Sequence, residues 1–307
     1  MDGASTATRE ILVTGGSGQV GTELQRLAMP PGWRIVAPPR GELDLADPRS
    51  IAAAVRARPW AAIINAGAYT AVDQAESDVV AAWQVNAMAP AALAAAATEA
   101  GGIPIVHVST DYVFPGDRAG AWEVDDPVAP LGVYGASKLA GELAIGTAQP
   151  RHAIVRTAWV VSAHGRNFVK TMLRLAADRD VLRVVADQHG SLTAAADLAA
   201  ALAAVAIRMA QDDGAPTGIF HFANQGPTTW HGVAEAVLKE SAARGGPSAQ
   251  VLPISSAEYP TPARRPANSL LSTARITRDY GIAPRPWQVA LNEILDELLA
   301  APGPATA

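Results

Sequence analysis

A tyrosine and a lysine four residues apart, Tyr134 and Lys138, could perform acid–base chemistry on a carbonyl group. Residues at this spacing share one face of a helix, so the phenol and the ammonium can lie side by side. A free tyrosine has a pKa of about 10, too high for easy proton donation near neutrality. Because a neighbouring ammonium lowers that pKa, the pair indicates a proton donor, although the same spacing is also common in ordinary helices.

A hydroxyl group is expected beside this pair. Ser109, Thr110 and Asp111 end the apolar run 103–109, which has strand character. The C-terminal ends of parallel strands meet at the edge where such folds bind ligands. A hydroxyl there would sit beside the tyrosine, although serine and threonine at a strand end are also typical of turns.

A glycine-rich loop near the N-terminus predicts a dinucleotide-binding site. Gly15, Gly18 and Gly21 follow the apolar run 11–14 and open a helical stretch. Glycine is needed because the turn adopts unusual backbone angles and the phosphates approach the backbone closely. The strand before the loop and the helix after it favour this interpretation over a glycine turn without a ligand.

At the position that distinguishes NADH from NADPH in many such sites, this sequence carries an arginine instead of an acidic residue. Many dinucleotide sites hold the adenosine ribose with an acid about 20 residues beyond the glycine loop. Here the second strand ends in VAPPR at 36–40, without an acid. Arg40 could meet the 2′-phosphate of NADPH, or it could be a solvated surface charge. NADPH and NADH therefore both stay open as the cofactor.

The elements that would position these residues follow a βαβ pattern. Short β-branched runs alternate with Ala-rich stretches long enough for crossover helices. The predicted strands are 11–14, 34–37, 61–65, 103–109 and 153–156. The fold class is therefore α/β, with a Rossmann-type doubly wound parallel sheet.

The pattern changes after about residue 160. Helices are predicted at 167–179, 194–210 and 229–243, and brief strands at 182–185, 218–222 and 251–254. Residues 255–269 contain three prolines and predict a long irregular loop, a kind of segment that is usually functional. We expect an NAD(P)-binding domain over 1–160, with segments returning from the C-terminal half. A smaller substrate-binding lobe is expected mainly over 161–307.

Composition excludes several function classes. The 307 residues carry a net charge of −5, which argues against a nucleic-acid surface. The absence of cysteine excludes disulfides, thiolate catalysis and Cys-ligated metals. The histidines lack metal-ligand spacing, so we predict no metal site, and His107 is expected to be a core residue. Without a polybasic patch or an apolar leader, we expect a cytoplasmic protein that does not bind membranes.

Together the motifs resemble the extended short-chain dehydrogenase/reductase superfamily, and within it the dTDP-4-dehydrorhamnose reductase family. The resemblance covers almost the whole chain, from Gly15 to about Leu295. The strings that carry it are GQVG at 18–21, TAVDQAE at 70–76, STDYVF at 109–114, YGASKLAGE at 134–142, RTAWV at 156–160, NFVKTM at 167–172, DQHG at 187–190 and YPTPARRP at 259–266.

The resemblance implies NAD(P)H-dependent reduction of the 4-keto group of dTDP-4-dehydro-6-deoxy-L-mannose, in dTDP-L-rhamnose biosynthesis. It implies that Tyr134 is the proton donor and that Lys138 lowers its pKa and holds the ribose. Thr110 would hydrogen-bond the keto oxygen, and Asp111 and Trp159 would touch the sugar.

For the cofactor, the resemblance implies contacts from five further residues and a main-chain cradle. Gly18, Gln19 and Val20 would hold the pyrophosphate. The residues that would line the rest of the cofactor are Asp44, Leu45, Ala68, Tyr69 and Thr70. Arg264 and Arg265 could clamp the diphosphate of the substrate, because a guanidinium matches phosphate oxygens, or they could be a structural pair.

The chain departs from the family pattern at two places. Ser191-Leu192-Thr193 lacks the proline usual after the DQHG string. Some bacterial members bind magnesium at a dimer interface through acidic side chains. Glu23 matches one of these, whereas Ala196 stands at another. A homodimer remains an open expectation.

Two other functions stay open. One is a different nucleotide-sugar enzyme, an epimerase or a dehydratase, but those usually need a further acid beside the threonine, and no glutamate follows Thr110. The other is a non-catalytic, NADP-binding regulatory subunit like that of methionine adenosyltransferase. The intact set Thr110, Tyr134, Lys138 and Trp159 favours the reductase over both.

Overall fold

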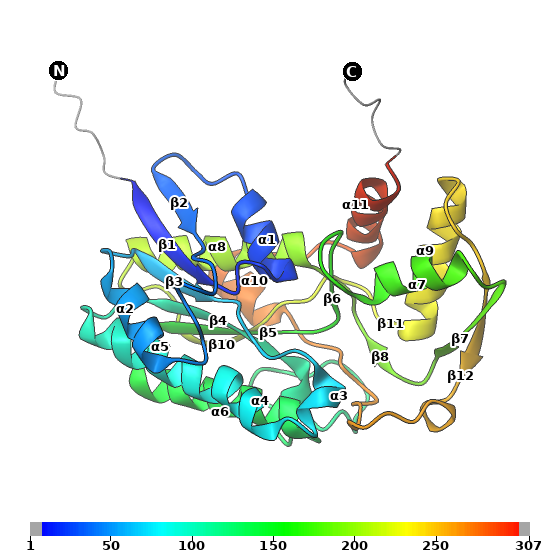
Figure 1. The fold of residues 1–307 in the computed structure, drawn as a ribbon, viewed down its shortest axis with the longest axis horizontal. Helices are drawn as coiled ribbons and strands as arrows, with labels where there is room; N and C mark the ends of the chain where they lie inside the picture. Colours follow the sequence, from blue (N-terminus) through cyan, green and yellow to red (C-terminus); the bar gives the residue numbers. More distant parts are fainter. Residues whose placement is uncertain (1–7, 301–307) are drawn as a thin grey trace.

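A six-stranded parallel sheet organises the computed structural model, which describes residues 8–300 (Figure 1). The strand order is β10-β5-β4-β3-β1-β2, and every neighbouring pair is parallel. Its strands are β1 (Arg9–Thr14), β2 (Trp33–Val36), β3 (Ala62–Asn65), β4 (Ile105–Thr110), β5 (His152–Thr157) and β10 (Gly218–His221). The order reverses between β1 and β3, and such switch points are where these sheets bind ligands.

Helices cover both faces of the sheet, which confirms the doubly wound α/β prediction (Figure 1). The helices α1 (Gln19–Arg26) and α8 (Ala195–Gln211) cover one face. The other face is covered by α2 (Pro48–Arg56), α5 (Ala89–Glu99) and α6 (Val133–Ala148). Both faces are buried because the strands carry apolar residues at successive positions instead of alternating ones.

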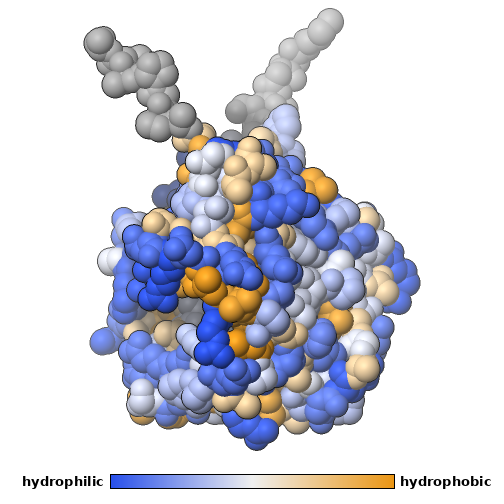
Figure 2. All heavy atoms as spheres, turned by 90° about the vertical axis from the view of Figure 1, so that its right-hand side faces the viewer, coloured by the Kyte–Doolittle hydropathy of each residue, from blue (hydrophilic) through white to orange (hydrophobic). Residues whose placement is uncertain are grey.

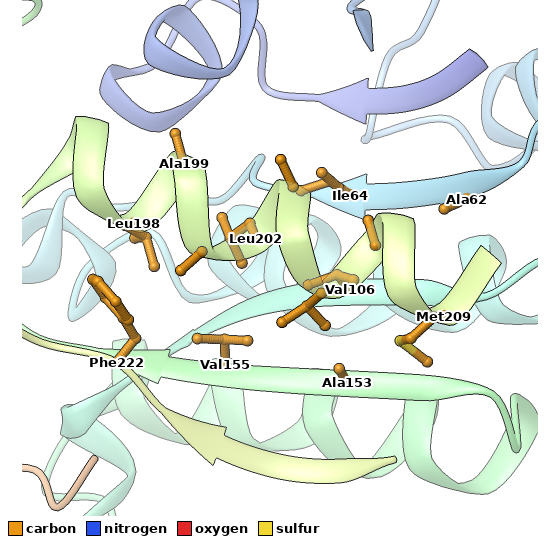
Figure 3. Packing of buried hydrophobic residues seen from close by; sticks show 14 of the residues in the cluster. Ala62, Ile64, Val106, Ala153, Val155, Leu198, Ala199, Leu202, Met209 and Phe222 are labelled. Carbon is orange, nitrogen blue, oxygen red and sulfur yellow. The ribbon is translucent and has the colours of Figure 1, made fainter. Parts of the chain in front are cut away.

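The packing of α8 shows how helices bury one face of the sheet. Leu198, Leu202 and Met209 point from the helix toward apolar side chains of β3, β4 and β5 (Figure 3). Their partners include Ile64 and Val155. Both α8 and the edge strand β10 come from the C-terminal half of the chain, so segments that return from there complete the six-stranded sheet and its helical cover.

A long helical run between β3 and β4 is interrupted by a π-helix. It consists of α3 (Val72–Ala75), α4 (Val79–Trp83), the π-helical turn Gln84–Met88 and α5. The run Val79–Glu99 is apolar and long enough to cross a membrane, and 44% of its apolar window is buried. Since it packs against α2 and α6, we assign it to the core of the fold.

The remaining elements form a smaller C-terminal group, at the right of Figure 1. They are β6 (Val160–Val161), α7 (Phe168–Ala176), β7 (Val181–Val185), β8 (His189–Gly190), β9 (Thr193–Ala194), β11 (Thr228–Thr229), α9 (Trp230–Ala243), β12 (Gln250–Ile254) and α11 (Trp287–Leu299). This group has its own apolar core, whereas α10 (Ala274–Tyr280) packs beside β10. The division near residue 160 stays a prediction. Residues 255–269 are irregular apart from the 3₁₀ turn Ser256–Glu258, as expected.

Candidate active site

The glycine loop between β1 and α1 is shaped for a close main-chain approach. Gly15 has a φ of 71°, and a Cβ atom there would lie 2.5 Å from the Cα atom of Gly67. A Cβ on Gly21 would lie 2.1 Å from the Gly15 carbonyl oxygen. Gly18 caps α1 without a side chain, so the helix N-terminus presents bare main-chain N–H groups. Such an end suits a phosphate group.

A pocket of about 1090 Å³ opens beside this loop. Its walls come from the ends of β1, β2 and β3 and from α4 and the π-helical turn. Six residues expected at the cofactor lie in its lining, namely Gly15, Arg40, Asp44, Leu45, Ala68 and Tyr69. Gly18, Gln19, Val20, Gly21 and Thr70 are not part of the lining. The Gln19 side chain instead accepts a hydrogen bond from Asn167 Nδ2 at 2.9 Å.

Arg40 stands at this pocket with its side chain 83% exposed and only a 3.5 Å contact to Asp44. A free guanidinium at this position can bind a 2′-phosphate. We therefore expect Arg40→Ala to raise the KM for NADPH roughly tenfold, the size of one hydrogen bond to a charged group, and to leave the KM for NADH unchanged. Arg49→Ala, on an exposed residue outside the pocket, is the control. Equal changes for both cofactors would rule out phosphate recognition.

Thr110, Asp111 and Tyr134 lie together at the C-terminal end of β4. Thr110 Oγ1 donates to Asp111 Oδ1 at 3.0 Å and accepts from the Tyr112 amide at 3.2 Å. Burial raises the pKa of Asp111 to about 6, and the hydroxyls of Ser269 and Thr110 partly offset this. The predicted neighbourhood of hydroxyl, carboxyl and phenol is therefore present in the structure.

Tyr134 is half-buried near the N-terminal end of α6. Burial raises its pKa above the ordinary value, the Thr110 hydroxyl partly lowers it, and the Asp111 charge raises it again. The ring of Tyr112 packs edge-on against it, with centroids 5.4 Å apart. The phenol is protonated at neutral pH, as any tyrosine is, and its raised pKa is the opposite of the lowering that the sequence predicts.

Lys138 lies one turn further along α6 and is 2% exposed. Its Nζ donates to the Val108 carbonyl at 2.7 Å and is 3.4 Å from His107 Nε2. Burial lowers the pKa of Lys138 to about 8, partly offset by Glu142. The ammonium faces the strand and not the phenol, so the structure gives no sign of the expected lowering of the Tyr134 pKa.

A buried ion pair lies beyond Lys138 on the same helix face. Glu142 accepts hydrogen bonds from Arg156 Nε at 2.9 Å and Nη2 at 2.7 Å, and from Ser109 Oγ at 2.5 Å. Both charged side chains are 2% exposed. The i, i+4, i+8 spacing of 134, 138 and 142 puts the three side chains on one face of α6, so the sequence carries a signal for Glu142 beside the tyrosine–lysine pair.

Asn86 connects the cofactor pocket to the helix that carries Tyr134 and Lys138. Its Oδ1 accepts from the Tyr69 amide at 2.8 Å, and its Nδ2 donates to the Tyr69 carbonyl and to Ser137 Oγ, both at 3.1 Å. A Cβ on Gly141 would lie 2.2 Å from the Asn86 carbonyl oxygen. π-Helical turns such as this are frequent at functional sites, but the sequence carries no local signal for one.

Trp159 is held in an unusual conformation at the boundary between the sheet and the C-terminal group. It has a φ of 50°, the only positive value at a non-glycine residue among those described. Its ring stacks on Trp230 at 3.9 Å, and a Cβ on Gly190 would lie 2.6 Å from it. Strained backbone of this kind persists only where the surroundings enforce it, and it concentrates at ligand sites.

The two arginines of the irregular loop have different environments. Arg265 Nη2 donates to Asp73 Oδ2 at 2.7 Å, so this guanidinium is used within the protein. Arg264 is exposed and has no ion pair in the described part of the chain. Arg265 Nη1 is buried without a hydrogen-bond partner, so Arg265 keeps one donor unused while the whole Arg264 guanidinium is exposed. The face seen in Figure 2, which carries the C-terminal elements, shows a hollow with a hydrophilic rim.

Glu23, which matches a magnesium-binding position of some family members, has other partners here. Glu23 Oε1 is 3.7 Å from His164 Nε2, and its Oε2 is 3.6 Å from Arg26 Nε. Within residues 8–300, no group of three or more His, Asp or Glu side chains is arranged to hold a metal ion.

Comparisons with known proteins agree with this geometry. The family model described as "RmlD substrate binding domain" matches residues 9–300. The chain is 42% identical over 298 residues to the dTDP-4-dehydrorhamnose reductase of Burkholderia thailandensis, covering 95% of this chain and 99% of the relative.

Two solved structures named dTDP-4-dehydrorhamnose reductase share the fold. That of Clostridium acetobutylicum has a TM-score of 0.87 at 34% identity. That of Bacillus anthracis, in complex with NADP, has a TM-score of 0.87 at 33% identity. Each match covers 94% of this chain and 99% of the other.

Proposed function

This chain belongs to the dTDP-4-dehydrorhamnose reductase family, and we propose that Thr110, Tyr134 and Lys138 carry its chemistry. The protein is an NAD(P)H-dependent oxidoreductase. It reduces the 4-keto group of dTDP-4-dehydro-6-deoxy-L-mannose to give dTDP-L-rhamnose. The observation that supports the assignment of residues is their convergence on β4, together with Asn86, which links the helix that carries Tyr134 and Lys138 to Tyr69 in the pocket lining.

The residues at the pocket fit a nicotinamide dinucleotide. The glycine loop leaves main-chain N–H groups at the start of α1 where the pyrophosphate would lie. Arg40, Asp44 and Leu45 line the end of the pocket suited to the adenosine. When bound, NADPH or NADH supplies the hydride that reduces C4 of the sugar.

Tyr134 donates its proton to the oxygen of the reduced carbonyl, and the Thr110 hydroxyl hydrogen-bonds the same oxygen. A protonated phenol delivers its proton once negative charge develops on that oxygen. Lys138 binds the ribose with the N–H not used by the strand and stabilises the phenolate that is left. Lys138 therefore stabilises the Tyr134 phenolate when the proton is transferred, and it does not lower the Tyr134 pKa in the resting enzyme.

We assign the sugar to the space between Asp111 and Trp159, and the diphosphate to Arg264. Arg264→Ala should raise the KM for the nucleotide sugar about tenfold, as expected for loss of one charge-assisted hydrogen bond, with kcat unchanged. The matched control is Arg179→Ala, which removes an exposed arginine from the loop after α7. An unchanged KM in the Arg264 variant would remove this residue from the binding site.

The regulatory-subunit alternative predicts cofactor binding without turnover, and the epimerase alternative predicts turnover without net cofactor oxidation. Wild-type protein with NADPH and the keto sugar distinguishes all three, because only a reductase consumes one cofactor for each sugar. The homodimer and the cytoplasmic location stay predictions, and light scattering tests the first.

A further inference from the structure

A row of buried polar side chains crosses the sheet on the face that packs against α6. Thr14, Asn65 and His107 occupy paired register positions on the neighbouring strands β1, β3 and β4. All three are at most 1% exposed. The positions two residues earlier on the same strands, Leu12, Ile63 and Ile105, are apolar. The polar row therefore lies at the C-terminal ends of β1 and β3 and in the middle of β4, three residues before Thr110.

Hydrogen bonds link this row into a chain that ends at Lys138. Thr14 Oγ1 donates to Asn65 Oδ1 at 2.6 Å, and Asn65 Nδ2 is 2.9 Å from His107 Nδ1. His107 Nε2 is 3.4 Å from Lys138 Nζ. At its other end, Thr14 Oγ1 accepts from the Gly67 amide at 3.1 Å. The chain thus runs from the glycine-loop side of the pocket to the lysine.

Burying three polar side chains in one row costs free energy unless each of them is hydrogen-bonded. Apolar side chains could also pack against α6 at these positions, so packing alone does not explain why the row is polar. Lys138 supplies one, because a buried ammonium has three N–H donors and the Val108 carbonyl accepts only one of them.

We propose that His107 is a positioning residue for the reduction: held by Asn65 and Thr14, it fixes Lys138 and accommodates the lysine in both charge states. This inference rests on the proposed role of Lys138. Besides His107 on β4, the titratable group that acts on Lys138 is Glu142. Glu142 and Tyr134 both share the face of α6 that carries Lys138.

The hydrogen-bond directions can follow the charge of the lysine. With Asn65 Nδ2 donating to Nδ1, the ring proton sits on Nε2 and faces an uncharged amine. When Lys138 is an ammonium, the ring carries its proton on Nδ1 and the Asn65 amide turns over to accept it. The ring itself stays neutral, since burial and the Lys138 charge hold the pKa of His107 well below its usual range.

Two substitutions separate the contact with Lys138 from the rest of the packing. An asparagine at 107 can reach Asn65 in place of Nδ1 but removes Nε2, whereas a glutamine can reach Lys138 in its place. For His107→Asn we expect kcat to fall about tenfold, the size of one hydrogen bond to a charged group, with the KM for the sugar unchanged. Loss of an acceptor lowers the pKa of the ammonium, so the alkaline limb of the kcat profile should move to lower pH. His107→Gln should recover part of the lost kcat and should move the alkaline limb part of the way back toward its wild-type position.

A purely structural role would lower the melting temperature of both variants and leave kcat and its pH profile as in wild type, which would overturn the proposal. Histidine ¹⁵N NMR of the wild-type protein tests it without any His107 variant. The tautomer of His107 should change as Lys138 titrates, and this change should vanish in Lys138→Met. A fixed tautomer across that range would also contradict the proposal. Absence of turnover in wild type would instead count against the proposed function.

Discussion

Replacing Tyr134 by phenylalanine should lower kcat by about 10²–10⁴-fold, the usual contribution of a positioned general acid. The expected loss is large because no other phenol or carboxyl in the described site is placed to replace it without rearrangement. The nearest phenol, Tyr112, packs its ring edge-on against Tyr134, and burial raises its pKa to about 12. The nearest carboxyl is Asp111, but its Oδ1 accepts from Thr110, and it would have to be protonated. Burial raises its pKa only to about 6, so near neutrality it is mostly ionised.

The binding of the cofactor should survive the same change. Tyr134 does not line the pocket beside the glycine loop, and its ring packs edge-on against Tyr112 through atoms that phenylalanine retains. Fluorescence titration with NADPH should give a Kd close to that of wild type. Tyr280→Phe removes a phenol bonded to the Pro216 carbonyl, remote from the site, and should leave kcat unchanged. A Tyr134→Phe enzyme with near wild-type kcat would exclude this residue as the acid.

Replacing Glu142 by leucine should destabilise the protein by about 3–5 kcal/mol, because the change leaves the Arg156 charge buried without a partner. Arg156 is among the largest fully buried side chains of the protein, and Glu142 is its carboxylate partner. The loss should appear in urea denaturation as a lower midpoint with an unchanged m value.

The double variant Glu142→Leu/Arg156→Met should recover much of that loss, since replacing a whole buried ion pair by apolar residues is often neutral or better. Glu99→Ala, which breaks an exposed pair with Arg56, should cost at most about 1 kcal/mol. Equal losses in the Glu142 and Glu99 variants would show that burial of the pair does not determine its contribution.

The sheet and the glycine loop could be predicted because their signals are local. Each expected strand of the sheet was a short β-branched run, and the glycines stood between a strand and a helix. The brief strand at 218–222 was also detected, but its place at the edge of the main sheet was not. Pairing of β10 with β5 depends on packing between segments some 60 residues apart, to which local periodicity is blind.

The parts of the site also differ in whether their signals are local or depend on packing between distant segments. Tyr134, Lys138 and Thr110 lie in short motifs, and their convergence followed from the rule that parallel strands end at one edge. The direction in which Lys138 points did not follow, because its acceptors, Val108 and His107, lie on another element. His107 was correctly expected in the core, but its contacts with Asn65 and Lys138 require the register of three strands.

The most direct test of the central claim is to supply wild-type protein with dTDP-4-dehydro-6-deoxy-L-mannose and NADPH deuterated at the transferable position. We predict that one cofactor is oxidised for each sugar and that deuterium appears at C4 of the product by mass spectrometry and NMR. Tight cofactor binding without oxidation, or a changed sugar without deuterium at C4, would contradict the assignment of this site as a 4-keto reductase.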